Sequence, residues 1–162
     1  MSVVAVRRVG PDEWRSWREV RLAALTDTPE AFSSTLEREL TFDEPTWRQR
    51  LDPATGVRVL AVVDEAFAGL VGTYLPEDAP DPELVSMWIR PASRGAGAAG
   101  ALVAEVLDWA RERRHERVKL WVVEDNEPAR RLYQRHGFVS TGEFMPYPHH
   151  PCLREERMVR AL

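Results

Sequence analysis

The chain has little cysteine and no long apolar run. A single cysteine, Cys152, stands among 162 residues, so no internal disulfide is expected, and this usage suits a reducing compartment. The longest apolar stretch, Val59–Val63, is far too short to cross a bilayer, and Met1–Arg8 lacks the apolar segment of a signal peptide. These absences predict a cytoplasmic protein with no membrane partner.

An excess of positive charge is also missing. The sequence has 22 basic and 26 acidic residues, which gives a formal net charge of −4. Its arginines mostly adjoin acidic residues, as in Arg111-Glu112 and Arg154-Glu155, and this alternation is typical of a solvated face. We therefore expect no nucleic-acid partner. The length fits a single domain over residues 1–162, because no linker or repeat divides it.

The apolar patterns predict strands and helices in alternation. The expected strands are Val3–Arg8, Val57–Val63, Ala66–Leu75, Glu83–Arg90, Val118–Val123, Phe138–Phe144 and Arg154–Arg160. The expected helices begin at Pro11-Asp12, cover Thr46–Leu51 and Ala98–Arg114, and run from Asn126 to Gly137, with Ala31–Leu40 helical or irregular. The short Asp64-Glu65 link predicts a hairpin, and the helix between Glu83–Arg90 and Val118–Val123 predicts a parallel crossover. The fold class is therefore α+β, with mostly antiparallel strands.

The segment Arg94-Gly95-Ala96-Gly97-Ala98-Ala99-Gly100 carries most of the functional information. It joins an apolar strand to the N-terminus of the long amphipathic helix. Because glycine has no Cβ, the backbone can turn sharply there and present its N–H groups at the positive end of the helix dipole. Such a bend binds phosphate groups, so the sequence predicts a phosphorylated ligand.

Several interpretations compete for this segment. A P-loop needs Lys-Ser or Lys-Thr after the last glycine, and Ala101-Leu102 excludes it. Gly95–Gly100 does match the dinucleotide pattern G-x-G-x-x-G, and Glu124 stands where a ribose-binding acid would. Against that hypothesis, Pro91–Arg94 separates the strand from the first glycine, and too few residues follow Glu124 for a doubly wound sheet. A purely structural turn stays open as well.

Two motifs together point elsewhere. Arg94 begins an Arg-x-x-Gly-x-Ala pattern. Further on, the strand Leu120–Val123 leads into Asn-x-x-Ala-x-x-x-Tyr-x-x-x-Gly-Phe, which begins at Asn126. In this spacing the two motifs resemble the GCN5-related N-acetyltransferase (GNAT) superfamily, and the element order resembles it over the whole chain. The family often has glycine where this sequence has Ala99, although alanine is also common there.

The resemblance implies a GNAT-like fold, with a splayed, mixed, mostly antiparallel sheet of about seven strands and about four helices. It also implies acetyl-CoA as co-substrate and direct transfer of the acetyl group to a primary amine in a ternary complex. Backbone amides of the glycine segment would hold the CoA diphosphate, and main-chain groups of the preceding strand would meet the pantetheine arm and polarise the thioester carbonyl. The residues so assigned to the cofactor are Trp88, Ile89, Arg94, Gly95, Ala96, Gly97, Ala98, Ala99, Asn126 and Tyr133.

Tyr133 is the first candidate for a catalytic residue. A phenol with an ordinary pKa of about 10 can protonate a thiolate whose pKa is about 8.5 at small cost. Its helical face, shared with Ala129 and Leu132, is equally typical of a core position. The resemblance favours the role of acid or thiolate stabiliser. For Asn126 the helix cap is clear from the sequence, and the resemblance adds a contact with the pantetheine arm.

A base is also needed, because an alkylammonium with a pKa near 10.4 must lose a proton before it attacks. The resemblance points to Glu83, at the start of the strand that leads to the glycine segment, although a solvent-facing acid is the alternative. Glu37 and Glu39 are weaker candidates. Together with Glu77, Asp78 and Asp81, Glu83 also hints at a cationic amine acceptor.

The remaining motifs carry less functional information. Cys152 has no neighbour that marks an activated nucleophile. The group His149-His150 with Cys152 matches no zinc spacing, so no metal is predicted, and we expect this segment to be a loop that borders the acceptor site. The six tryptophans are expected in the core, with Trp88 a candidate exception. The sequence does not identify the acceptor, which is a small-molecule or a protein amine. It also leaves the oligomeric state open, and a homodimer is one of the possibilities. The alternative to an enzyme is a non-catalytic CoA-binding sensor domain on the same fold.

Overall fold

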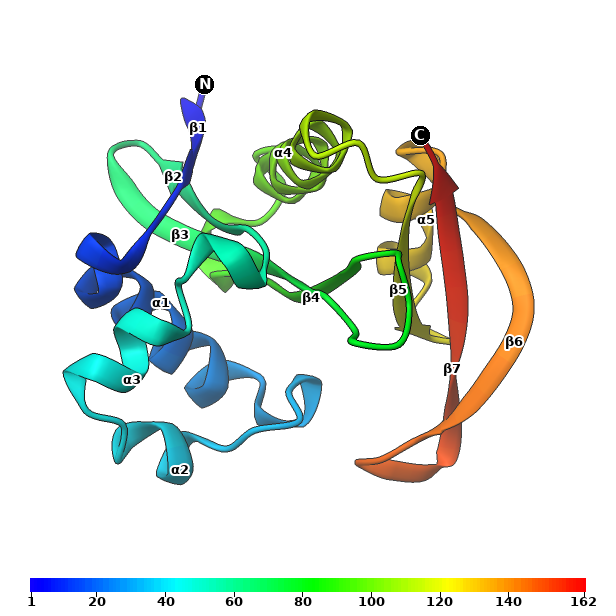
Figure 1. Ribbon diagram of the computed structural model, residues 1–162, viewed down its shortest axis with the longest axis horizontal. Coiled ribbons are helices and arrows are strands. Elements are labelled where there is room, and N and C mark those ends of the chain that lie inside the picture. Colours follow the sequence, from blue (N-terminus) through cyan, green and yellow to red (C-terminus); the bar gives the residue numbers. More distant parts are fainter.

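The computed structural model describes residues 1–162, which fold around one twisted sheet (Figure 1). The sheet has seven strands in the order β1-β2-β3-β4-β5-β7-β6. Only β4 and β5 are parallel neighbours, and every other pair is antiparallel. The predicted mixed, mostly antiparallel sheet is therefore confirmed. The strands are β1 (Val4–Arg8), β2 (Arg58–Val63), β3 (Ala66–Tyr74), β4 (Glu83–Ile89), β5 (Arg117–Val123), β6 (Val139–Tyr147) and β7 (His150–Ala161).

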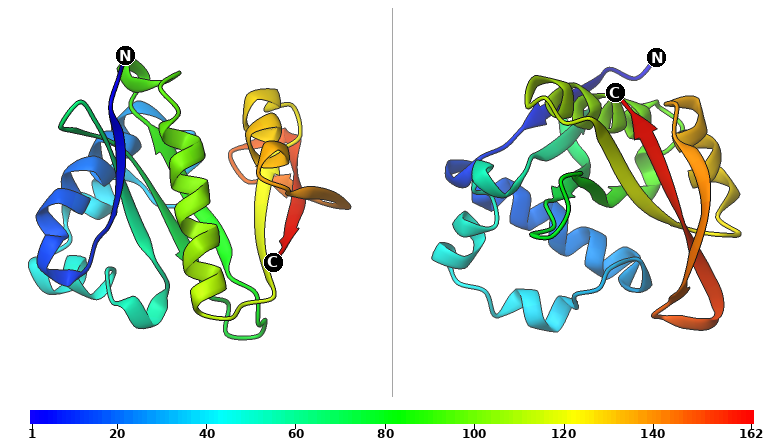
Figure 2. Two further views of the ribbon diagram at one scale, coloured as in Figure 1. Left: turned by 90° about the horizontal axis from the view of Figure 1, so that it is seen from above. Right: turned by 45° about the vertical axis from the view of Figure 1, so that its right-hand side comes forward.

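Helices cover both faces of the sheet (Figures 1 and 2). They are α1 (Trp14–Asp27), α2 (Leu36–Leu40), α3 (Glu44–Gln49), α4 (Ala98–Glu112) and α5 (Glu127–Arg135). The larger apolar core lies between the sheet and α4 and α5, and a second core lies under α1, α2 and α3. Trp88 belongs to the second core at 5% exposure, so the expected exception is wrong. The tryptophans that are only partly buried are Trp14 and Trp121. None of the helices combines the length and the apolar character that spanning a bilayer requires.

Local signals placed most elements correctly. Asp64 and Glu65 form the predicted hairpin turn between β2 and β3, both with positive φ. The Asp43 carboxylate accepts from the Thr46 N–H at 3.0 Å and caps α3, which therefore begins two residues earlier than the predicted Thr46–Leu51. The capping acid fixes the first turn directly after itself.

The last two strands are longer than predicted. The sequence predicts a break over Met145–Pro151, but β6 continues to Tyr147 and β7 already begins at His150. Prolines normally interrupt a strand ladder, because they lack an N–H. Pro146 instead pairs with Arg154 in the β6–β7 ladder, and β6 is the outer strand of the sheet, where a missing N–H facing solvent is tolerated.

The sheet opens between β4 and β5, as Figure 1 shows. Glu83 and Lys119 form the one paired position between these two strands. Beyond that point β4 carries a bulge, where its register against β3 shifts and Ser86 adopts a φ of +62°. A bulge bends and twists a strand away from its neighbour. The fold therefore separates two parallel strands in the middle of the sheet, where a ligand can enter.

A buried ion pair joins α1 to α2 next to this opening. Arg21 donates to both oxygens of Glu39, at 3.0 and 2.9 Å, and Arg50 lies 3.3 Å from the same carboxylate. Burial alone would raise the pKa of Glu39, but the two guanidinium groups hold it below its usual value. Arg21 also donates to Ser86 Oγ at 2.9 Å, so the pair supports the bulge of β4.

We expect the substitution Arg21→Met to lower the free energy of unfolding by about 3–5 kcal/mol, because it leaves Glu39 buried and undercompensated. Arg8→Met is the matched control, since Arg8 also binds two carboxylates but on the surface, where about 0–1 kcal/mol is expected. Urea denaturation measures both. Because the pKa of Glu39 is lowered by folding, the contribution of the pair is present at neutral pH and is lost as the pH falls below the ordinary glutamate range. Equal losses in the two variants would contradict this prediction.

Candidate active site

A cavity of about 480 Å³ lies where β4 and β5 separate. Its walls come from β4, β5, α5, the β6–β7 turn and the segment between α1 and α2. The predicted catalytic residues Glu83 and Tyr133 both line it, and so does Asn126. The structure thus brings Glu83 together with Asn126 and Tyr133, which come more than forty positions later in the sequence.

The glycine segment follows β4 and bends sharply into α4. Gly95 and Gly97 have φ angles of +86° and +91°, a region that side chains with a Cβ avoid. No atom lies within 4 Å of where a Cβ would stand at either glycine. The glycines are therefore needed for the conformation of the backbone rather than for close packing.

This bend leaves a row of backbone donors without partners. No acceptor in the chain takes the N–H groups of residues 95–100, and the first paired amide of the helix is that of Ala101, which donates to the Gly97 carbonyl at 3.1 Å. The first four N–H groups of any α-helix lack a partner within the helix, and here the preceding glycine turn adds further free donors. Six successive free donors at the N-terminus of a 15-residue helix make a site that suits a diphosphate.

The side chain of Arg94 turns back onto the protein. Its Nε donates to the Ile89 carbonyl at 3.0 Å, and its Nη2 lies 3.4 Å from Asp27 at the end of α1. Trp88 Nε1 donates to the same carboxylate at 2.9 Å. Hydrogen bonds from Trp88 and Thr28 hold the pKa of Asp27 below its usual value. Asp27 therefore ties α1 to both ends of the turn that leads into the glycine segment.

The two strand residues predicted to meet the cofactor differ in their main-chain directions. Trp88 pairs with Leu70 of β3. The Arg90 N–H donates to the Ala68 carbonyl at 2.7 Å, so in the alternating antiparallel pattern the N–H and C=O of Ile89 point away from β3, toward the opening. The Ile89 carbonyl is taken by Arg94, and its N–H stays available to an acceptor in the opening.

Tyr133 lies at the base of the cavity on α5. It is 6% exposed and packs edge-on against Phe138 at 5.8 Å between ring centroids. Burial raises the pKa of its phenol to about 12, and its hydroxyl has no hydrogen-bond partner within the chain. The ring is therefore a core residue, as one interpretation of the sequence predicts, and the residue also lines the cavity, where a catalytic role would place it.

The predicted carboxylates occupy different environments. Glu83 lines the cavity and accepts from Arg157 at 3.0 Å. Glu39 has a fully buried side chain in the ion pair with Arg21, and Glu37 is exposed; neither lines the cavity. Of the acids thought to mark an entrance, Asp81 is 3% exposed and lies 3.3 Å from both Arg117 and Lys119. It braces the sheet rather than facing an acceptor.

Residues that the sequence did not single out complete the cavity. Glu155 of β7 and Tyr147 of β6 line it, and the Tyr147 hydroxyl donates to the Glu30 carbonyl across the gap to the α1–α2 segment. His149, in the loop expected to border the acceptor site, lines it as well. Cys152 is exposed and lies outside the cavity. No group of three or more His, Cys, Asp or Glu side chains is arranged to hold a metal ion.

Comparison with known proteins agrees with this geometry. The family model for the acetyltransferase (GNAT) family matches residues 14–138. The chain belongs to the GNAT acetyltransferase family. A mycothiol acetyltransferase from Beutenbergia cavernae is 30% identical over 83% of this chain but only 44% of its own length. The chain thus spans less than half of the curated relatives it matches.

Solved structures support the GNAT fold. A GNAT-family acetyltransferase from Streptococcus pneumoniae superposes with a TM-score of 0.80 at 18% identity, and covers 99% of this chain and 100% of its own. The PaiA N-acetyltransferase from Thermoplasma acidophilum, in complex with coenzyme A, has a TM-score of 0.71 at 13% identity and covers 99% of each chain. The predicted splayed GNAT sheet is confirmed by these similarities.

Proposed function

We propose that this chain transfers the acetyl group of acetyl-CoA to a primary amine by direct attack in a ternary complex. The observation that carries the proposal is the row of free N–H groups in residues 95–100, at the end of the strand that borders a cavity containing Tyr133. Acetyl-CoA would use both features at once, with its diphosphate on these N–H groups and its thioester in the opening beside Tyr133.

In this proposal the amides of Gly95–Ala99 hold the diphosphate, and Arg94 adds positive charge nearby. The pantetheine arm lies along the free edge of β4, where Ile89 offers its N–H, and Asn126 flanks its path. Trp88 takes no direct part, because its main chain pairs with β3 and its side chain lies in the second core. A main-chain N–H of the bulged strand would polarise the thioester carbonyl. The strand opening is what admits the arm, because a fully paired β4–β5 ladder would have no free edge.

Tyr133 would stabilise the departing thiolate. With a pKa of about 12, its phenol is a weaker acid than ordinary tyrosine. Full proton transfer from this phenol to the thiolate, whose conjugate thiol has a pKa of about 8.5, would then cost about 5 kcal/mol. A hydrogen bond from the neutral phenol to the developing thiolate has no such cost and is worth more in a desolvated site. The phenol would pass its proton on only as it regains one from the attacking nitrogen.

Glu83 is the base that the family resemblance suggests. The residue lines the cavity, but an ion pair with Arg157 engages one oxygen of its carboxylate. Whether Glu83 takes the proton of the amine is tested below against a second carboxylate.

Release of free thiol from acetyl-CoA tests the proposed function. The amine panel contains benzylamine, phenethylamine, spermidine and a peptide with a free N-terminus. We expect saturable thiol release with at least one amine, and an acetylated product of the expected mass. Heat of binding with acetyl-CoA but no thiol release with any amine would indicate the CoA-binding sensor instead.

A further inference from the structure

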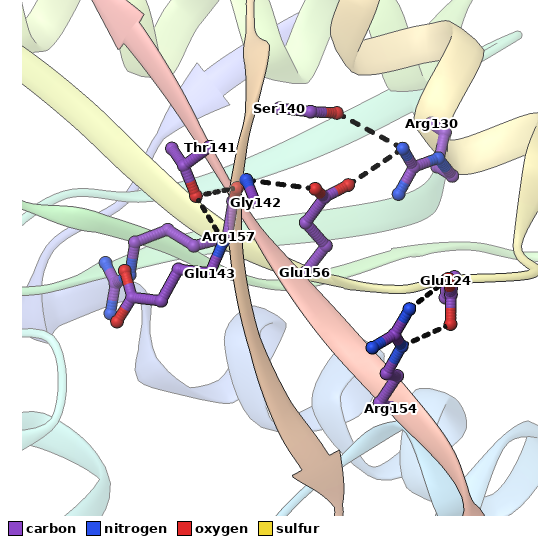
Figure 3. A network of polar contacts seen from close by, with 9 residues as sticks. All are labelled: Glu124, Arg130, Ser140, Thr141, Gly142, Glu143, Arg154, Glu156 and Arg157. Atoms are coloured by element: carbon purple, nitrogen blue, oxygen red, sulfur yellow. Dashed lines mark hydrogen bonds and ion pairs between the residues drawn. The ribbon is translucent and has the colours of Figure 1, made fainter.

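The strand β7 carries charged residues on both of its faces. On the face toward α5, Glu156 accepts from Arg130 at 2.9 Å and from the Gly142 N–H at 3.2 Å, and Arg154 donates to Glu124 at 2.7 Å (Figure 3). Successive side chains of a strand point to opposite faces. Glu155 stands between these two residues and therefore points the other way, into the cavity, which it lines.

Glu155 differs from the other carboxylates near the cavity in having no partner. Glu83 is bonded to Arg157, and Glu39 is held by two arginines. Glu155 is half-buried and makes no hydrogen bond or ion pair with its side chain. A partly buried carboxylate without a cation is costly to desolvate, and a cationic ligand in the cavity would offset that cost.

We propose that Glu155 binds the ammonium group of the acceptor and takes its proton before the amine attacks the thioester. This inference rests on the proposed function and assigns the acceptor side of the same site. It also specifies the acceptor as a primary amine that reaches the cavity as a cation. Tyr147, His149 and Trp121 also line the cavity, and the part of the acceptor beyond its ammonium group would contact these side chains.

The protons balance as follows. The ammonium gives one proton to the Glu155 carboxylate and becomes a neutral amine. Its nitrogen lone pair forms the C–N bond at the thioester carbonyl, and the C–S bond then breaks with its electron pair leaving on sulfur. The nitrogen loses a second proton to Tyr133 as the phenol gives its own to the thiolate. The products are the acetylated amine, CoA with a free thiol, and protonated Glu155, which releases its proton to solvent.

The environment of Glu155 suits this role. Burial raises the pKa of its carboxyl, and His149 opposes that change in part. The other titratable or charged groups around the cavity are Tyr147 of β6, Glu83 of β4, Arg157 of β7, Tyr133 of α5 and Arg21 of α1. A raised pKa brings a base closer to neutrality, where it accepts a proton more readily.

The test compares Glu155→Gln with Glu83→Gln in steady-state kinetics with two acceptors, benzylamine and 2,2,2-trifluoroethylamine. The second amine is already largely neutral near pH 7 and needs no base. We expect Glu155→Gln to lower kcat/KM for benzylamine by about 100-fold at pH 7, with most of this loss restored at high pH or with trifluoroethylamine. Glu83→Gln should affect both amines equally. Glu116→Gln, an exposed carboxylate whose side chain has no contact partner, is the matched control.

A second measurement does not depend on turnover. Benzylammonium chloride is titrated into the CoA-saturated protein and followed by calorimetry, with weaker binding by at least tenfold expected in Glu155→Gln. Equal binding in both proteins, or no binding to the wild type, overturns the inference. An acceptor-dependent loss in Glu83→Gln but not in Glu155→Gln also overturns it. Absence of thiol release by the wild type contradicts the proposed function instead, and leaves the calorimetric result to decide on Glu155.

Discussion

Replacing Gly97 with aspartate is expected to weaken acetyl-CoA binding by about 100-fold or more, with the protein still folded. Gly97 caps α4 with a φ of +91° and stands in the middle of the free N–H groups. An aspartate there would meet strain of about 1–2 kcal/mol and would set a negative charge against the diphosphate. Losing one charge-assisted hydrogen bond adds about 1.5–3 kcal/mol. Calorimetric titration with acetyl-CoA measures the change.

The strain itself can be separated from the effect on the ligand. Gly97→Ala and Gly142→Ala both place a Cβ at positive φ, +91° and +78°, where no atom lies within 4 Å. Both should lower the free energy of unfolding by about 1–2 kcal/mol. Only Gly97→Ala should also weaken acetyl-CoA binding, because Gly142 lies on β6. If Gly142→Ala weakened acetyl-CoA binding as much as Gly97→Ala, the glycine segment would have no special role in binding.

The glycine segment could be predicted because its signal is local. Glycine adopts a positive φ more readily than any other residue, so it marks such a position directly in the sequence, and Gly95 and Gly97 both have a positive φ. The Asn126 cap and the Gly137 stop of α5 are local in the same way. The β2–β3 hairpin and the parallel crossover from β4 to β5 were also accessible, since both follow from the lengths of the connections. The position of β7 between β5 and β6 was not predicted, because it depends on pairing between distant segments.

Glu155 could not be found in this way. In the sequence Arg154-Glu155-Glu156-Arg157 the two glutamates are equivalent, and alternation says only that they face opposite sides. Which side holds the cavity depends on the register Val123↔Glu155 and on the opening between β4 and β5. Both are set by pairing between distant segments, so no local signal distinguishes a paired carboxylate from a free one.

The bulge at Ser86 was hidden for a related reason. Nothing in Glu83–Ile89 marks a non-glycine residue with φ +62°. Such a conformation costs about 1–3 kcal/mol and persists only where the surroundings determine it. Here the Arg21–Glu39 pair supplies those surroundings, and it joins residues from two helices. A strained residue of this kind can be recognised only once the packing is known.

Replacing Tyr133 with phenylalanine is expected to lower kcat by about 100-fold, within the range for loss of a general acid. The KM for acetyl-CoA should change little, because the hydroxyl would act on the thiolate that forms in the transition state. The free energy of unfolding should stay within about 0.5 kcal/mol, since the hydroxyl bonds to nothing in the protein and the ring contact with Phe138 is kept. Steady-state kinetics and urea denaturation measure these effects, with Tyr74→Phe, at an exposed residue of β3, as control.

The pH dependence of kcat in the wild type tests whether Tyr133 acts in its protonated form. The pKa of Tyr133 is raised to about 12 by burial, so the phenol stays protonated through the neutral and moderately alkaline range. If the protonated form acts, kcat stays level up to a pH of about 10 and is lost only as the pH rises toward 12. A fall in kcat centred on the ordinary tyrosine value near 10, or a rise there, would contradict a buried phenol acting as hydrogen-bond donor. The level profile follows from the same desolvation that strengthens the hydrogen bond, because both disfavour the phenolate.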